Sequence, residues 1–367
     1  MCGIVGFVAR GRIKGSSGVL RAMARTIANR GPDDEGFLEV GTVNGIYHVG
    51  LGHRRLSIID LATGHQPMGN EDGQIQVVFN GEIYNFKELR QELITRGHQF
   101  STAADTEVIV HAYEEFGEAC VEKFRGMFAF ALWDANTEKL FLARDQFGKK
   151  PLFLYEGPGG FVFASEIKAI LAFPGVKVDV NRDALWDYLV YRYVPGPQTF
   201  FRGIVKLPPG SYAVWQQGGI TVQRYFSPPD RLSCAKRLID GDPVTGFREQ
   251  FDEAVRIRMV SDVPFGAFLS GGIDSSAVVA SMTRHSNMPV RTFSVGFAES
   301  RYSELAYARE IAQVFGTQHH ELVVSVSELM DYLPALVKAR DAPVSEPSDI
   351  PIYLLSREAR RSVKMVL

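Results

Sequence analysis

The sequence predicts two domains of different architecture: an α+β domain with mainly antiparallel sheets, then an α/β domain with a doubly wound parallel sheet. Its 367 residues are enough for about two domains. Short apolar strands broken by Gly and Asn dominate up to residue 205, whereas strands and helices alternate from residue 246 onward. Between them lie two Pro-containing polar segments, Ser227–Asp230 and Asp240–Pro243, which are typical of a linker.

The first domain is expected to span residues 2–205. Five apolar runs predict strands: Ile4–Val8, Ile75–Phe79, Met127–Trp133, Lys139–Ala143 and Phe161–Ala164. The polar stretch 134–138 predicts an antiparallel hairpin between two of them. Helical spacing of apolar residues predicts helices at Phe86–Thr95 and Thr106–Phe116, with Asp105 as the N-cap of the second.

Residues 206–245 are expected to connect the domains, and 246–367 to form the second one. The patterns predict the following helices and strands in turn: helix Gly246–Val260, strand Pro264–Leu269, helix Ser275–Thr283, strand Thr292–Phe297, helix Ser303–Phe315 capped by Ser303, strand Glu321–Val324, helices Glu328–Ala339 and Ile350–Arg360, and a final strand from Lys364. Such alternation favours a parallel sheet.

Composition excludes several classes of protein. Forty Lys and Arg against 42 Asp and Glu leave a net charge of −2, so no nucleic-acid or membrane-surface partner is expected. No apolar run is long enough for a transmembrane helix, and the N-terminus does not resemble a signal peptide. Cys2, Cys120 and Cys234 are too far apart for a disulfide scaffold or a CxxC zinc site. These features predict a cytoplasmic protein.

Cys2 directly follows the initiator Met1. Removal of Met1 is expected before a small residue, and it would give Cys2 a free α-amine. An α-amine has a reference pKa of about 7.7–8.0, so it can accept the thiol proton and activate the sulfur for acyl transfer. The alternative is that Cys2 is only a small buried residue of the first strand.

Asn80-Gly81 directly follows an apolar strand, where a side-chain amide and a backbone N–H can donate to one developing oxyanion. The alternative is a hairpin turn, because Asn-Gly is a common turn dipeptide. Glu82 and Asp105 are candidate acceptors for an ammonium group, and Arg55 is a candidate clamp for a carboxylate. Together these groups fit an α-amino acid with a reactive side-chain carbonyl.

The second domain contains a strand that runs from Phe268 into Ser270-Gly271-Gly272-Ile273-Asp274-Ser275-Ser276 and then into a helix. The glycines allow close backbone approach, while hydroxyls, N–H groups and the helix N-terminus favour phosphate. Asp274 is a candidate Mg²⁺ ligand. Val295-Gly296, near the end of the next strand, would lie beside a nucleotide base. The alternative is a structural Gly-rich turn.

Several strings in one order make the whole chain resemble the glutamine-hydrolysing asparagine synthetase family. These are Met1–Gly6, Asn29–Asp34, Arg55–Asp60, Asn80–Asn85, Asp105–Glu107, Ala143–Asp145, Gly148–Leu152 and the Ser270–Ser276 loop. The resemblance implies an N-terminal nucleophile glutamine amidotransferase domain, with antiparallel sheets sandwiched by helices, and an ATP-pyrophosphatase-type synthetase domain. The segment Phe124–Phe130 resembles a bacterial subgroup linked to exopolysaccharide and exosortase systems.

The resemblance also implies roles. Cys2 would hydrolyse glutamine, Asn80 and Gly81 would form the oxyanion hole, and Arg55, Glu82 and Asp105 would hold the substrate. The backbone from Arg55 through Leu56, Ser57 and Ile58 to Ile59 would line that pocket. Ammonia would pass to the second domain, where ATP and Mg²⁺ would adenylate aspartate. The residues implied to bind ATP are Phe268, Ser270, Gly271, Gly272, Asp274, Ser275, Ser276, Val295 and Gly296.

The family pattern continues beyond Leu367 with a loop that completes the pyrophosphate site, so this chain resembles a C-terminally truncated member. Three alternatives follow: a related carboxylate, for example one linked to exopolysaccharide, replaces aspartate; this chain is only a glutaminase; or it only binds glutamine or nucleotide. The expected partners are glutamine, ATP and the carboxylate, and a homodimer is left open.

Overall fold

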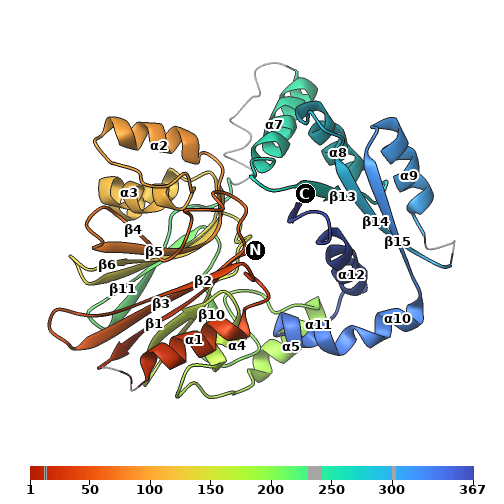
Figure 1. The fold of residues 1–367 in the computed structure, drawn as a ribbon. Helices are drawn as coiled ribbons and strands as arrows, with labels where there is room; N and C mark the ends of the chain where they lie inside the picture. The colour runs from red at the N-terminus through yellow and green to blue at the C-terminus, as the bar shows by residue number, and fades with distance from the viewer. Residues whose placement is uncertain (12, 14, 230–241, 300–302) are drawn as a thin grey trace. The chain divides into compact units, whose positions relative to one another are not determined.

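The computed structural model describes residues 1–11, 13, 15–229, 242–299 and 303–367, which form two compact units (Figure 1). The first unit is Met1–Pro228 and the second is Pro229–Leu367. Residues 230–241 of the predicted connecting segment, Cys234 among them, lie outside the described residues. None of the helices that the structure describes combines the length and the apolar character needed to cross a bilayer.

Two antiparallel sheets of six strands form the centre of the first unit. The first sheet has the order β10 (Ile204–Lys206), β8 (Phe153–Gly157), β9 (Gly160–Ala164), β1 (Gly3–Arg10), β3 (Tyr47–Arg55) and β2 (Asp34–Gly41). The second has the order β12 (Gly219–Arg224), β11 (Ser211–Gln216), β7 (Lys139–Arg144), β6 (Gly126–Asp134), β5 (Ile75–Ile83) and β4 (Met68–Gly69). The predicted hairpin between β6 and β7 is confirmed.

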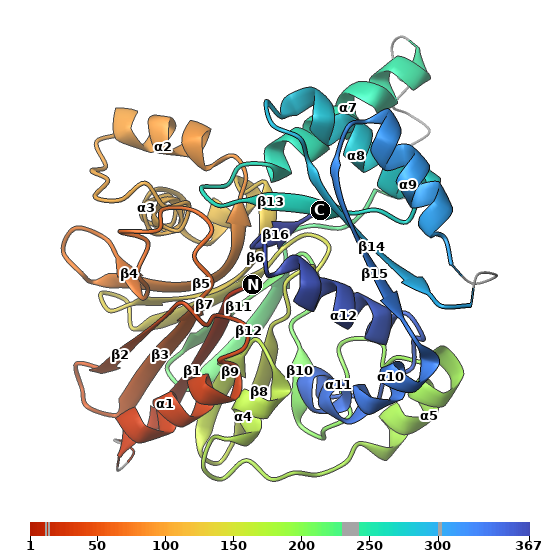
Figure 2. The ribbon, with the colours of Figure 1, turned by 45° about the vertical axis from the view of Figure 1, so that its right-hand side comes forward.

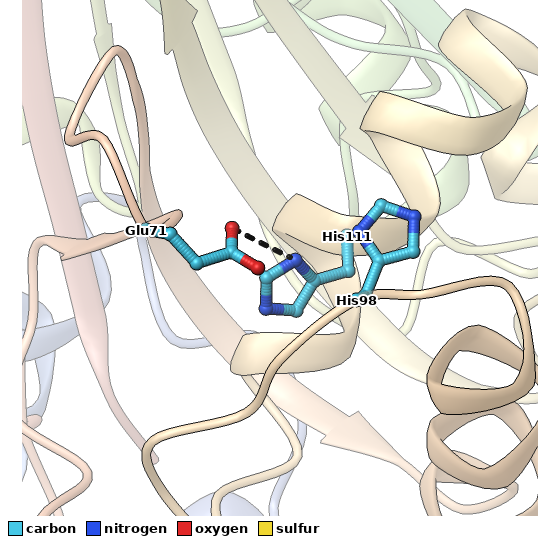
Figure 3. A group of neighbouring side chains, drawn as sticks. All are labelled: Glu71, His98 and His111. Carbon is cyan, nitrogen blue, oxygen red and sulfur yellow. Dashed lines mark ion pairs between the residues drawn. The ribbon is translucent and has the colours of Figure 1, made fainter.

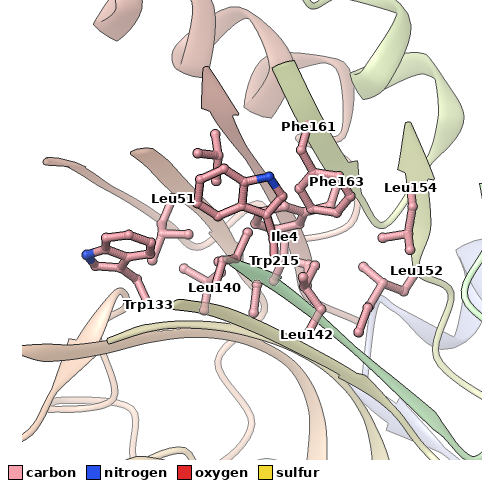
Figure 4. Close-up of a cluster of buried hydrophobic side chains, with 14 of the residues drawn as sticks. Ile4, Leu51, Trp133, Leu140, Leu142, Leu152, Leu154, Phe161, Phe163 and Trp215 are labelled. Carbon is pink, nitrogen blue, oxygen red and sulfur yellow. The ribbon is translucent and has the colours of Figure 1, made fainter. Parts of the chain in front are cut away.

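Apolar side chains hold these layers together because each strand alternates its side chains between two faces. Inward-facing residues such as Ile4, Leu142 and Trp215 fill the space between the two sheets (Figure 4). Helices α1 (Ser16–Thr26) and α4 (Ile167–Leu171) cover the outer face of the first sheet. The second sheet is covered by helices α2 (Phe86–Thr95) and α3 (Glu107–Phe116) (Figure 1). Helix α3 is followed by η1 (Gly117–Glu122). The predicted α+β sandwich is therefore confirmed.

Three sequence predictions for the first unit are wrong. Residues 206–228 belong to this unit rather than to a connecting segment, because they supply β11, β12 and the end of β10. The strand that was expected to end at Phe79 continues to Ile83, since its pairing with β6 runs from Ile75 to Ile83. The N-cap position of α3 is held by Thr106 rather than Asp105, whose carboxylate accepts the N–H of Ile83 instead.

The second unit contains a parallel sheet with the order β15 (Gln318–Val324), β14 (Arg291–Phe297), β13 (Phe265–Phe268) and β16 (Met365–Val366). Side chains alternate along β13, so that Ala267 packs with one apolar cluster and Phe268 with another. Helices α7 (Pro243–Arg258), α8 (Ile273–His285) and α9 (Leu305–Val314) lie on one face, and α12 (Asp349–Ala359) lies on the other (Figure 2). The predicted doubly wound sheet is confirmed.

Two details of this unit differ from the sequence predictions. Helix α9 begins at Leu305 with Glu304 at its N-cap position, and no side chain caps it, so Ser303 is not the cap. The single helix expected at Glu328–Ala339 is two helices, α10 (Val326–Asp331) and α11 (Leu333–Arg340). Pro334 in the first turn of α11 explains the break, because proline has no N–H for a helical hydrogen bond and favours a helix start.

Asp145 fixes the loop that follows β7. Its carboxylate is almost fully buried and accepts the backbone N–H groups of Phe128 (3.2 Å), Phe147 (3.1 Å), Lys149 (2.9 Å) and Lys150 (3.0 Å). One side chain therefore satisfies four main-chain donors and joins the loop to β6.

We expect Asp145→Ala to lower the free energy of unfolding of the first unit by at least about 3 kcal/mol, because a buried donor without a partner costs about 1–3 kcal/mol. Asp183→Ala, at an exposed position in the first turn of α5 (Arg182–Tyr191), should cost less than about 1 kcal/mol. Urea titration monitored by tryptophan fluorescence measures the free energy of unfolding of the first unit, because Trp133, Trp186 and Trp215 all lie in that unit. Equal losses in the two variants would contradict the role of Asp145.

Candidate active site

A cavity in the first unit collects most of the polar residues singled out in its sequence. It lies where the start of β1, the segment after β3, the middle of β5 and the start of α3 meet. Its lining consists of Met1, Cys2, Arg55, Leu56, Ile58, Ile59, Gly64, Gln66, Phe79, Asn80, Gly81, Glu82, Ala104, Asp105, Thr106 and Lys150. The fold thus brings together residues far apart in the sequence, such as Cys2 and Lys150.

Cys2 immediately precedes β1, and its main chain and side chain are both held. The Nε of Arg30 donates to the Cys2 carbonyl oxygen at 2.8 Å, and Arg30 is itself paired with Glu166 at 2.9 Å. The backbone N–H of Leu56 donates to the Cys2 Sγ at 3.4 Å, while the Sγ lies 3.7 Å from the Leu56 carbonyl oxygen. The sulfur is therefore oriented within the cavity.

Burial shapes the acid–base chemistry at this chain terminus. It raises the pKa of the Cys2 thiol, although the Leu56 N–H and the nearby α-amine oppose the shift. It lowers the pKa of the Met1 α-amine to about 6, because the charged form is desolvated. Near neutral pH the thiol thus keeps its proton, whereas an amine in this environment is largely free to accept one.

Asn80 is fully buried and lines the same cavity as Cys2. Neither its Oδ1 nor its Nδ2 has a hydrogen-bond partner among the described residues. Buried polar side chains are almost always paired, and leaving an amide unpaired costs free energy. Asn80 therefore has the character expected of a group that is paired only when a ligand is bound.

The backbone of β5 turns a second donor toward this cavity. Phe79 donates its N–H to the side chain of Gln66 at 2.7 Å, and Ile83 donates to Asp105 at 3.0 Å, both on the edge away from β6. Alternate residues of a strand direct their N–H groups to the same edge, so the Gly81 N–H also faces away from β6. A Cβ on Gly81 would lie 2.1 Å from the Met127 carbonyl oxygen, so close pairing with β6 requires glycine.

Asp105 is almost fully buried beside Glu82 in the cavity. Desolvation, with a further contribution from the Glu82 carboxylate, raises the pKa of Asp105 to about 7, although the Ile83 N–H opposes the shift. Two carboxyl groups in one cavity create a site that gains from a cationic ligand.

Arg55 is buried at the end of β3 and organises the loop that follows. Its Nη2 donates to the carbonyl oxygens of Ile59, at 3.2 Å, and of Asp60. The predicted pocket residue Ser57 is turned away: its N–H donates to the Asp33 carboxylate at 3.0 Å, and it is absent from the cavity lining.

Sequence reasoning missed Gln66, Thr106 and Lys150 as lining residues. Lys150 is 7% exposed, and desolvation lowers the pKa of its ammonium group. The motif Gly148–Leu152 contains this residue, but its position in the cavity depends on the loop that Asp145 fixes. Gln66 and Thr106 are joined by a side-chain hydrogen bond of 3.1 Å, which no local sequence pattern signals.

The second unit has its own cavity at the carboxyl ends of β13 and β14. Phe268, Ser270, Ser275 and Val295, all predicted from sequence, line it together with residues of α9 and α12. The loop before α8 is tightly bonded: the hydroxyls of Ser270 and Ser275 lie 2.9 Å apart, and the Gly272 N–H donates to the Ser270 Oγ at 3.2 Å.

Other predicted members of this site lie nearby but do not line the cavity: Gly271, Gly272, Asp274, Ser276 and Gly296. Gly271 has a φ of +82°, and a Cβ there would lie 2.6 Å from the Ala308 nitrogen, so the turn requires glycine. The Ser276 Oγ is buried and lacks a hydrogen-bond partner within the described part of the chain.

Comparison with known proteins assigns both units. A model of the glutamine amidotransferase domain matches residues 1–226, and a model of asparagine synthase matches residues 246–367. The glutamine-hydrolysing asparagine synthetase 1 of Bacillus subtilis is 37% identical over 372 residues, which cover all of this chain and 57% of that protein. This chain belongs to the glutamine-hydrolysing asparagine synthetase family.

Two further relatives bear similar names. A putative asparagine synthetase of Mycobacterium tuberculosis is 39% identical over all of this chain and 58% of its own length. A putative asparagine synthetase 2 of Methanocaldococcus jannaschii is 36% identical over all of this chain and 73% of its own length. The chain thus spans less than two thirds of the length of the Bacillus subtilis and Mycobacterium tuberculosis relatives.

Proposed function

We propose that this protein is a glutamine-dependent amidotransferase that hydrolyses glutamine at Cys2 and uses the ammonia to amidate an ATP-activated carboxylate, normally aspartate. The observation that carries the proposal is the buried Asn80 amide, which has no hydrogen-bond partner among the described residues and lies in the same cavity as the oriented Cys2 sulfur. A nucleophile beside donors for a developing oxyanion is the arrangement that acyl transfer requires.

Removal of Met1 would make the α-amine of Cys2 the base. That amine would take the thiol proton as the sulfur attacks the side-chain carbonyl carbon of glutamine. The Asn80 amide and the Gly81 N–H would stabilise the oxyanion. The amine would then protonate the leaving nitrogen, which departs as ammonia and leaves a thioester on Cys2. Water would cleave the thioester to glutamate and restore the thiol.

The same cavity offers complementary groups for both ends of the amino acid. The Nη2 of Arg55 is used by the loop, and among the described residues its Nε and Nη1 have no hydrogen-bond partner, so these two donors would serve the α-carboxylate. Glu82 and Asp105 would hold the α-ammonium group. The lining residues Leu56, Ile58 and Ile59 would cover the apolar part of the substrate, and Ser57 would support the loop through Asp33.

The second unit would bind ATP. Ser270, Gly271, Gly272, Ser275 and Ser276 would hold the phosphates at the start of α8, while Phe268, Val295 and Gly296 would contact the adenosine. Asp274 is exposed in the first turn of α8. One carboxylate together with phosphate oxygens is a donor set that suits Mg²⁺, which would neutralise phosphate charge. The activated carboxylate would be an acyl-adenylate, and its reaction with ammonia would release AMP.

The acceptor carboxylate is aspartate in this proposal, as the names of the relatives suggest. A carboxylate linked to exopolysaccharide synthesis is the second candidate, because residues 124–130 resemble that subgroup. A reactive free thiol favours a reducing compartment, so we place the protein in the cytoplasm.

Asn80→Ala should lower kcat for glutamine hydrolysis about 100- to 1000-fold, which is typical for the loss of one oxyanion donor. Its free energy of unfolding should change little, because the amide has no partner to lose. The matched control is Asn136→Ala, at an exposed turn. A variant of Asn80 that keeps its kcat, measured by glutamate release, would contradict the oxyanion role.

Glutamine affinity should rise about tenfold between about pH 6 and pH 8, because Asp105 with a pKa of about 7 becomes ionised. The ammonium group of free glutamine stays charged over this range, because the amine of a free amino acid is more basic than the α-amine of a peptide. Calorimetry on Cys2→Ala measures binding without turnover. In Asp105→Asn the pH dependence should disappear. In Glu82→Gln the transition should move to lower pH, because a neighbouring negative charge is lost. An unchanged profile in Asp105→Asn would exclude Asp105 as the titrating group.

The full-length gene product, incubated with glutamine, ATP, Mg²⁺ and aspartate, should form AMP and pyrophosphate, and chromatography of the nucleotides measures the AMP. Ser270→Ala should lose AMP formation but keep glutamine hydrolysis, and Cys2→Ala should show the reverse when ammonia is supplied. ADP in place of AMP would contradict the adenylation mechanism. Glutamate and ammonia without any nucleotide product would favour a glutaminase.

A further inference from the structure

A group of nitrogen and oxygen donors lies in the first unit apart from the residues that line the Cys2 cavity. Glu71, His98 and His111 each direct one ligand atom into a region where these atoms all lie within 4.8 Å of one another (Figure 3). Glu71 lies in the turn between β4 and β5, His98 follows α2, and His111 lies on α3. Three segments distant in sequence therefore meet at one point.

Two carboxylates are oriented toward His111 in the same way. The Oε1 of Glu71 accepts the Gln99 N–H at 3.0 Å, and its Oε2 lies 3.8 Å from the His111 Nδ1. The Oε1 of Glu114 accepts the Asn70 side-chain amide at 2.8 Å, and its Oε2 lies 2.9 Å from the same Nδ1. Each carboxylate thus has one oxygen anchored and the other turned toward the imidazole.

The opposite side of the His111 ring also faces a carboxylate. His111 is 1% exposed, and its Nε2 lies 3.8 Å from the Glu107 Oε1 without a hydrogen-bond partner among the described residues. The backbone N–H groups of Ser101 and Thr102 hold Glu107 at 2.7 Å and 2.8 Å. A carboxylate behind a histidine is the usual support of a metal-binding imidazole, since it orients the ring and raises its basicity.

We propose that Glu71, His98 and His111 form a site for a divalent transition-metal ion such as Zn²⁺, with Glu114 as the adjacent carboxylate. Imidazole and carboxylate donors suit Zn²⁺, whereas Mg²⁺ and Ca²⁺ prefer oxygen ligands alone. Glu71 is exposed, so the ion has access from solvent. The bound ion ties the β4–β5 turn and the loop after α2 to α3.

The competing arrangement is a proton on His111, held among Glu71, Glu107 and Glu114 as a buried imidazolium. It needs neither His98 nor a metal ion. A metal ion must displace any proton on the His111 Nδ1, so the two arrangements exclude each other. They differ in the number of metal ions bound per chain, and only the metal site depends on His98.

Calorimetric titration with ZnCl₂, on the full chain carrying Cys2→Ala to remove the cavity thiol, tests the proposal. We expect one Zn²⁺ per chain, and affinity at least about tenfold lower in both His98→Ala and Glu71→Gln. The matched control is His65→Ala, an exposed histidine paired with Asp34 instead. Circular dichroism confirms folding, and Glu71→Gln keeps the test valid because Glu71 is exposed and glutamine keeps an oxygen that can accept the Gln99 N–H.

Co²⁺ provides a second readout, since its visible absorption bands report coordination by nitrogen and oxygen ligands. These bands should appear in the parent protein and in His65→Ala but not in His98→Ala. Absent Zn²⁺ binding would overturn the proposal in favour of the protonated His111. Zn²⁺ binding by His98→Ala and Glu71→Gln with the affinity of the parent protein would also overturn it, because the ion would then lie elsewhere.

Discussion

The pairing of β5 with β6 through Ile83 is the constraint on which the Cys2 cavity depends. This pairing keeps residues 80–83 extended, so that Phe79, Gly81 and Ile83 direct their N–H groups to one edge while Asn80 is held in the interior. Gln66 and Asp105 occupy the N–H groups on either side of Gly81. A turn at Asn80-Gly81 would not hold these groups in the extended strand that lines the same cavity as Cys2.

Burial is the second constraint, and it shifts the pKa of four ionisable groups in this cavity. It raises the pKa of Cys2 and Asp105 and lowers the pKa of Lys150 and of the terminal amine. The cavity thus keeps polar groups in high-energy states that a bound amino acid would relieve. Asn80 is the extreme case, because neither the oxygen nor the nitrogen of its amide has a partner in the part of the chain that the structure describes. Such costs are tolerated where a ligand compensates for them.

Much of the fold and of the candidate site could be predicted from the sequence. The order of strands and helices indicates both fold classes. Residue type and motif order single out six residues of the cavity: Cys2, Arg55, Asn80, Gly81, Glu82 and Asp105. The sequence does not predict that Asn80 and Gly81 belong to a strand, since the dipeptide Asn-Gly favours a turn. Only the pairing with β6 overrides this preference. Lys150 and Gln66 reach the cavity through loops fixed by distant contacts. His98 and His111 likewise meet only because α2 and α3 pack together.

The most direct test of the central claim is covalent trapping with a chloroketone analogue of glutamine, followed by mass spectrometry of the intact protein and of its N-terminal peptide. We expect one adduct per chain, on a peptide that begins with Cys2 because Met1 has been removed, and protection by glutamine. No adduct should form in Cys2→Ala. An adduct on another residue, or full glutamine hydrolysis by protein that retains Met1, would contradict an N-terminal cysteine nucleophile.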